Sequence, residues 1–143
     1  MSMTTVSLDT NLIVSVLNQE KGLCDRAIEA IERSRKSGRL VVSGPVYAEL
    51  MAGPFREESH LDMFFADTGI GIDWIMGEDI WREAGRAYLG YVQRRKECGA
   101  EPPRRILADF LIGAHAMVRG YCLLTTDDRH YKVAFPKLVT IHI

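Results

Sequence analysis

Several features that would narrow the class of this protein are scarce in its 143 residues. The three cysteines, Cys24, Cys98 and Cys122, form no Cys-x-x-Cys pair, so neither a zinc site nor a thiol redox motif is indicated. No apolar run approaches the roughly 20 residues of a membrane-spanning helix, and the N-terminus lacks the basic and apolar regions of a secretory signal. We therefore expect reduced cysteines, no membrane association and a cytoplasmic location.

An excess of charge of one sign is also absent, because the formal net charge is −1. The whole molecule therefore offers no strong electrostatic steering towards nucleic acid, and any such binding must come from local basic patches. This weighs against a simple nucleic-acid-binding module. The composition, with 47% hydrophobic and 26% charged residues, is that of one globular domain spanning residues 1–143.

Strand and helix signals alternate along the chain, which predicts an α/β domain with a largely parallel central sheet. The predicted strands are 4–8, 40–42, 70–75, 121–125 and 138–143, the last at a sheet edge. Helices are predicted over 11–17, from 24 to a stop at Gly38, from Pro45, and over 56–65, 78–98 and 106–119. Apolar side chains at helical spacing, including Ile28 and Trp81, are expected to face the core.

Carboxylates recur where the predicted strands end. Asp9 follows the first strand, Asp127 and Asp128 follow the strand at 121–125, and Glu49 lies about one helical turn beyond the second strand. Asp109 lies in the first turn of the predicted helix 106–119. In parallel α/β sheets ligands bind beyond the carboxyl ends of the strands, so we expect these acids to meet at one rim.

Such a cluster favours a bound cation, because like charges close together raise each other's pKa. Mg²⁺ or Mn²⁺ prefers oxygen ligands and can activate water and stabilise charge on a phosphate. Each acid also has a structural interpretation: Asp9 as a helix cap, Glu49 as a solvated helix residue, Asp109 as a complement to a helix dipole, and Asp127 and Asp128 as turn residues. The expected placement of four acids at one edge of the sheet favours a catalytic role over these structural ones.

Four segments resemble, in order, the motifs of PIN-domain ribonucleases. They are VSLDTN at 6–11, SGPVYAEL at 43–50, LADFLIGAHA at 107–116 and LLTTD at 123–127, the last followed by Tyr131 and Phe135-Pro136. Together they cover almost the whole chain. In its length and in the residues of these motifs, the sequence is most similar to VapC-type toxins of bacterial and archaeal toxin–antitoxin pairs.

The resemblance implies a three-layer α/β/α PIN-like fold and a single nuclease domain over residues 1–143. It implies a Mg²⁺- or Mn²⁺-dependent endoribonuclease that hydrolyses RNA phosphodiester bonds. Asp9, Glu49, Asp109 and Asp127 would be the catalytic residues and would hold the metal, directly or through water. Asn11 and Thr125 would be polar supports around them.

The same resemblance implies partners. A cognate VapB-like antitoxin would wrap the enzyme and block its site, and RNA would be the substrate. A homodimer is also expected, because dimerisation is common in the family.

One position departs from the family pattern. The last motif usually has a basic residue between Thr and Asp, and here that residue is Thr126. The doublet Asp127-Asp128 leaves the fourth acid open. The Thr-x-Asp spacing favours Asp127, and Asp128 is the alternative that would share part of the role.

Two other functions are considered. One is a catalytically inactive PIN-like domain that binds RNA or protein, against which the presence of all four acids argues. The other is a phosphatase with Asp9 as nucleophile; such enzymes usually need a second Asp two residues on, where Asn11 stands.

Two further groups of residues have alternative roles. Arg104 and Arg105 precede Asp109 and are either RNA phosphate contacts or part of a solvated linker. His115 lies six residues beyond Asp109, about 240° around an ideal helix. We therefore expect His115 to be structural.

Overall fold

A five-stranded, all-parallel sheet forms the centre of the computed structural model, which describes residues 3–53, 57–99 and 107–143. Its strands are β1 (Val6–Leu8), β2 (Leu40–Ser43), β3 (Gly71–Asp73), β4 (Cys122–Thr125) and β5 (Thr140–His142), in the spatial order β3-β2-β1-β4-β5. Val6, Leu8 and every residue of β2 are buried. Burial of nearly continuous apolar strands is typical of a parallel sheet covered on both faces.

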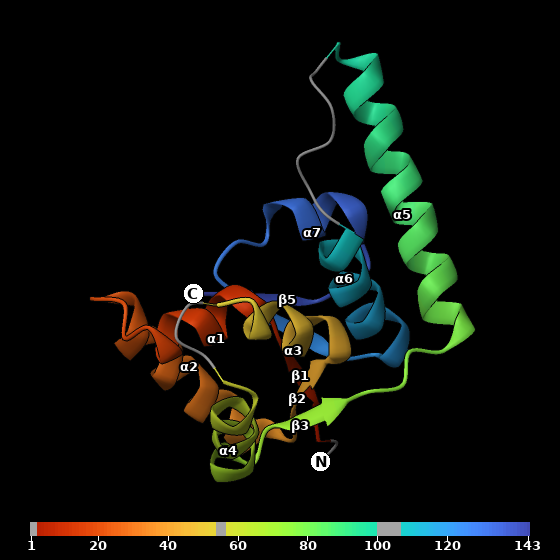
Figure 1. The fold of residues 1–143 in the computed structure, drawn as a ribbon. Helices are drawn as coiled ribbons and strands as arrows, with labels where there is room; N and C mark the ends of the chain where they lie inside the picture. The colour runs from red at the N-terminus through yellow and green to blue at the C-terminus, as the bar shows by residue number, and fades with distance from the viewer. Residues whose placement is uncertain (1–2, 54–56, 100–106) are drawn as a thin grey trace.

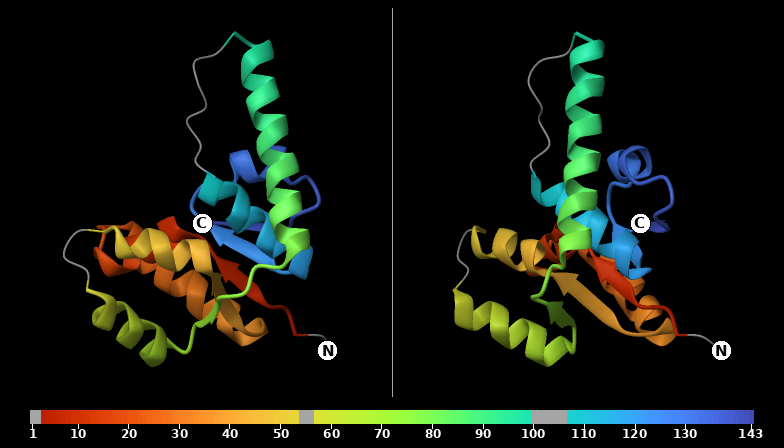
Figure 2. Two further views of the ribbon diagram at one scale, coloured as in Figure 1. Left: turned by 45° about the vertical axis from the view of Figure 1, so that its right-hand side comes forward. Right: turned by 90° about the vertical axis from the view of Figure 1, so that its right-hand side faces the viewer.

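Helices enclose this sheet to give the predicted three-layer α/β/α fold (Figure 1). They are α1 (Thr10–Leu17), α2 (Leu23–Ser37), α3 (Gly44–Met51), α4 (Glu58–Thr68), α5 (Glu78–Glu97), α6 (Leu107–Arg119) and α7 (Arg129–Ala134). The long helix α5 packs along α6 and projects beyond the rest of the molecule (Figure 2). None of the helices in the described ranges is both long and apolar enough to cross a membrane.

Most of the predicted strands and helices are present. They differ from the prediction in where some of them end and in which side chains of two helices are buried. The edge strand β5 is confirmed but is confined to Thr140–His142. The short helix α7 was not predicted, because its six residues span less than two turns and show no helical period. Ile28 and Trp81 were wrongly assigned to buried faces, since they are 43% and 51% exposed.

The order of the strands determines where the site lies. From β1 the chain adds β2 and then β3 on one side, and afterwards crosses over to add β4 and β5 on the other. Ser7 of β1 therefore pairs with Val41 of β2 and with Leu123 of β4. In such sheets ligands bind at the carboxyl ends of the two strands where the order reverses, here β1 and β4.

Gly113 of α6 allows the C-terminal part of the chain to pack closely against this edge. A Cβ atom built on Gly113 would lie 2.6 Å from Cδ2 of Phe135 and 3.1 Å from Cδ1 of Tyr131. Both rings belong to the segment that follows β4, and both are buried. The absence of a side chain at Gly113 thus permits close packing of the Tyr131 and Phe135 rings on α6.

We expect Gly113→Ala to lower the free energy of unfolding by about 1–3 kcal/mol, because the added methyl group overpacks this contact. Gly85→Ala in α5 is the matched control, since nothing lies within 4 Å of its added Cβ. The control should raise stability by about 0.5–1 kcal/mol through helix propensity. Denaturant unfolding of the two variants and the native chain measures both effects, and equal stability of the two variants would contradict the packing role of Gly113.

Candidate active site

Asp9 is the most buried carboxylate at the carboxyl edge of the sheet. It follows β1 directly, its N–H donates to the carbonyl of Leu124 at 3.0 Å, and only 4% of the residue is exposed. Its Oδ1 accepts from the Thr10 N–H at 2.8 Å, so Asp9 is the N-cap of α1. Its Oδ2 accepts from the Thr125 hydroxyl at 2.7 Å. The side chain is therefore fixed from both flanking segments.

Burial dominates the electrostatics of this carboxyl. It raises the pKa of Asp9 above its ordinary value, and the nearby charge of Glu49 acts in the same direction. Hydrogen bonds from Thr125 and from the Thr10 N–H oppose that rise without cancelling it. Asp9 is thus a carboxyl that a nearby cation would strongly favour in its ionised form.

Glu49 reaches the same place from α3. Ser43 ends β2 and is the N-cap of α3, with Pro45 in the first turn of that helix. One turn later, Oε1 of Glu49 accepts a hydrogen bond of 2.7 Å from the Thr10 hydroxyl. Thr10 therefore connects the two acids, since its N–H binds Asp9 and its hydroxyl binds Glu49.

Tyr131 is influenced by three of the predicted acids, Asp109 among them. Its pKa is well above the ordinary value, first because the ring is buried and then because the charges of Asp9, Asp109 and Glu49 disfavour a phenolate. The hydroxyl is buried, and its interaction with the Asp9 carboxylate raises the pKa of Tyr131 further. Three of the four predicted acids thus lie close enough to the Tyr131 phenol to raise its pKa.

Asp127 is nearby but is engaged differently. Its N–H donates to the Thr125 hydroxyl at 3.1 Å, the same hydroxyl that donates to Asp9. Its side chain accepts from Arg129 at 3.1 and 3.2 Å, and this bidentate bond lowers the pKa of Asp127 to about 2. Asp127 is therefore linked to Asp9 through Thr125, while its carboxylate binds Arg129.

Asp128 points into a different environment. Its Oδ2 lies 3.1 Å from Nζ of Lys132 and accepts a bond of 3.4 Å from the Thr140 hydroxyl, which ties it to α7 and β5. No contact of Asp128 with Asp9 or Glu49 is observed in the described part of the chain. Of the two residues, Asp127 is thus the one whose backbone is joined to Asp9 through Thr125.

The remaining predicted residues do not join the cluster or cannot be placed. Asn11 is exposed on α1, and it is Thr10, one residue earlier, that binds Glu49. Arg104 and Arg105 lie outside the described residues.

The acids present are suited to a hydrated divalent ion. Within 3–53, 57–99 and 107–143, no three Asp, Glu, His or Cys side chains converge at metal-ligand distances. Mg²⁺, however, usually keeps several waters and takes only one or two carboxylates directly. A buried Asp9 with the charge of Glu49 beside it, and a phenol that carries the influence of three acids, fit that kind of binding.

His115 is separate from this site. It is fully buried, and its Nε2 lies 2.9 Å from Oδ2 of Asp73 at the end of β3. Its ring meets that of Tyr121 edge to face at 5.6 Å. Burial lowers the pKa of His115, and the bond to Asp73 only partly opposes this. His115 joins α6 to the edge strand β3, away from Asp9.

Two residues that matter in this geometry were not assigned roles by the sequence. Thr10 was overlooked because it follows Asp9 and reads as an ordinary first helical residue. Tyr131 belongs to the last motif, but nothing in the sequence indicated that its hydroxyl is buried among acids. A hydroxyl residue directly after the strand-end Asp is the one local signal that pointed to Thr10.

Taken together, the fold and the cluster define a parallel α/β protein with an acidic site at the switch point of its sheet. The family model of the PIN domain matches residues 6–136. The chain therefore belongs to the PIN domain family.

Solved structures with the same fold span the full chain. VapBC2 from Rickettsia felis, bound to a promoter DNA fragment, is similar at 21% identity and a TM-score of 0.65, covering 98% of this chain and 99% of that one. VapBC-1 from nontypeable Haemophilus influenzae is similar at 21% identity and a TM-score of 0.67, covering 97% of this chain and 98% of that one. A toxin–antitoxin complex from Klebsiella pneumoniae is similar at 19% identity and a TM-score of 0.65, covering 96% of this chain and 99% of that one. Comparison with curated proteins gives no significant match.

The buried His115 should make stability depend on pH. Because the pKa of His115 is lowered on folding, the unfolded chain binds the proton more readily than the folded one. The contribution of neutral His115 to the free energy of unfolding is therefore complete above about pH 6.5 and is lost as the pH falls below that value. We expect His115→Gln to lose less unfolding free energy than the native chain between pH 7.5 and 5.5. His60→Gln, at an exposed position, is the control. A His115→Gln profile parallel to the native one would refute this.

Proposed function

We propose that this chain is a divalent-metal-dependent endoribonuclease and the toxin of a VapBC-type toxin–antitoxin pair. The observation that carries the proposal is the buried Asp9 carboxylate at the switch point, with Glu49 held beside it and Asp109 acting on the same phenol. Membership of the PIN domain family supports it, since PIN domains are generally nucleases.

Asp9, Glu49 and Asp109 would hold Mg²⁺ or Mn²⁺, directly or through water, with Asp127 as the fourth acid. When bound, the cation supplies an activated water and stabilises charge on the scissile phosphate. The protein fixes the acids in advance: Thr125 and the Thr10 N–H orient Asp9, and the Thr10 hydroxyl orients Glu49. Such preorganisation spares the cost of ordering the acids during the reaction.

The similar solved structures also suggest which partners the chain has. The similar structures from Rickettsia felis and Haemophilus influenzae are VapBC assemblies, and that from Klebsiella pneumoniae is a toxin–antitoxin complex. We propose a VapB-like antitoxin that covers the acidic site, RNA as the substrate, and a homodimer in the cytoplasm.

Purified protein, freed of antitoxin, should cleave structured RNA in Mg²⁺ or Mn²⁺ and not in chelator. Asp9→Asn should lower the rate at least about 100-fold, since even partners outside the ligand set commonly cost 10–100-fold. Cleavage of total RNA followed by gel electrophoresis measures both.

Circular dichroism provides the control for Asp9→Asn. The substitution keeps the size and shape of the side chain and removes a buried charge, so the variant should fold. Absence of cleavage by the folded native chain with every metal and with transfer, ribosomal and messenger RNA would favour an inactive binding domain.

Asp127 and Asp128 can be separated by matched substitutions. Asp127→Asn should reduce cleavage at least about tenfold, because the proposal makes the Asp127 carboxylate the fourth acid, in the turn that Thr125 joins to Asp9. Asp128→Asn should have a smaller effect, because Asp128 binds Lys132 and Thr140. Initial rates of cleavage under identical metal concentrations decide between them, and the reverse order would assign the fourth position to Asp128.

A further inference from the structure

Tyr131 is the buried side chain of α7, the six-residue helix that follows the turn after β4. The residue as a whole is fully buried, and its hydroxyl oxygen is buried with it. A buried hydroxyl is costly unless it has a polar partner, so a phenylalanine would be the simpler residue for packing alone. Packing therefore explains the ring of Tyr131 but not its hydroxyl.

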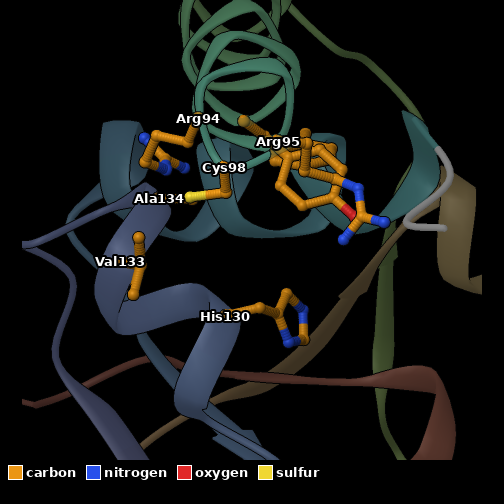
Figure 3. A pocket seen from close by; sticks show the side chains of 8 residues that line it. Arg94, Arg95, Cys98, His130, Val133 and Ala134 are labelled. Atoms are coloured by element: carbon orange, nitrogen blue, oxygen red, sulfur yellow. The ribbon is translucent and has the colours of Figure 1, made fainter. Parts of the chain in front are cut away.

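Two contacts fix the ring. It lies against α6 at Gly113, where an added Cβ would be 3.1 Å from Cδ1 of Tyr131. The ring of His130 packs on it with centroids 4.0 Å apart, and Figure 3 shows that His130 side chain extending from α7 beside the cavity that it lines. Gly113 is one helical turn beyond Asp109 in α6. The ring is therefore confined close to that acid, and its hydroxyl is held at one position.

The hydroxyl contacts the carboxylate of Asp9. Two donors already bind that carboxylate, the Thr10 N–H at 2.8 Å on Oδ1 and the Thr125 hydroxyl at 2.7 Å on Oδ2. Tyr131 interacts with it as a third donor. Because an ionised carboxylate can accept about four hydrogen bonds, the third donor does not displace the other two.

The turn before α7 is joined to the same carboxylate. The Asp127 N–H donates at 3.1 Å to the Thr125 hydroxyl that binds Asp9. Tyr131 follows four residues after Asp127, so the chain that leaves β4 returns to Asp9 through a second side chain. The position of the phenol thus depends on the same hydrogen bonds that orient the acid.

A phenol is suited to this position because it donates a hydrogen bond without adding a charge. The charges of Asp109 and Glu49 also act on it. A lysine in its place would pair with these acids and compete with a cation for them. A phenol, whose ordinary pKa is about 10, keeps its proton at neutral pH and remains a donor.

From the burial, the packing and these contacts we propose that Tyr131 is a positioning residue of the acidic site. Its hydroxyl holds the Asp9 carboxylate in the orientation in which the acids bind a divalent cation. The inference rests on the proposed function, because it takes these acids as the cation site. It adds a role for α7, which brings the third donor to Asp9.

Tyr131→Phe removes only the hydroxyl and should weaken Mn²⁺ binding roughly tenfold or more, as is common for groups that orient metal ligands. Electron paramagnetic resonance of free Mn²⁺ measures this affinity without RNA and without cleavage. Tyr121→Phe is the matched control, because it also loses one phenol hydrogen bond, the 3.2 Å bond from Arg39. Tyr121 precedes β4 at the amino end of that strand, so its variant should bind Mn²⁺ as the native chain does.

Two further measurements separate positioning from packing. Mn²⁺ should raise the free energy of unfolding less in Tyr131→Phe than in Tyr121→Phe, since this gain depends on the dissociation constant and not on the stability of the metal-free chain. Mg²⁺ should change the near-ultraviolet tyrosine absorbance of the native chain and of Tyr121→Phe, and this change should be lost in Tyr131→Phe.

The outcomes distinguish this inference from the proposed function. Equal Mn²⁺ affinity of the Tyr131→Phe and Tyr121→Phe variants would overturn the positioning role, and RNA cleavage by the native chain would then still support the nuclease. Mn²⁺ binding that depends on Tyr131, in a native chain that cleaves no RNA, would support the positioning role and refute the nuclease. Absence of Mn²⁺ binding by the native chain would refute both.

Discussion

The carboxylate of Asp9 is buried where β1 and β4 lie side by side, and the arrangement of the site depends on how that burial is compensated. The Asp9 N–H continues the pairing of β1 with β4 by binding Leu124, and the side chain accepts from Thr10 and Thr125. A buried charge without such partners would cost several kcal/mol. These hydrogen bonds reduce that cost, yet the pKa of Asp9 remains raised, so they compensate the burial only in part.

The same principle explains the hydroxyl groups that surround the acids. Thr125 donates to Asp9 and accepts from the Asp127 N–H, so one hydroxyl orients an acid and fixes the turn after β4. Thr10 does the equivalent between Asp9 and Glu49. Residues next to the acids thus position them without adding charge, which is how several carboxylates can be kept close together in a folded chain.

The sequence predicted the strands and the parallel sheet, because burial of continuous apolar runs acts locally. The roles of the four acids, which the carboxyl-edge rule suggested, stay a prediction. The sequence did not predict α7, whose helix is too short to show a period, nor the burial of the Tyr131 hydroxyl. These depend on tertiary contacts such as the close approach of Phe135 to Gly113. The exposure of Ile28 and Trp81 was missed for a related reason, since helical spacing does not reveal how much of a face is covered.

Basic residues along α5 differ in what they contact. Near the start of that helix, Arg82 and Arg86 pair with Glu78 and Glu83 one turn away, and such exposed pairs contribute little. In the last turn, basic side chains also stabilise the helix dipole, so their sign alone says nothing of a ligand. Arg94 and Arg95 differ because they line a cavity whose other walls reach the residues next to Asp109 and Tyr131.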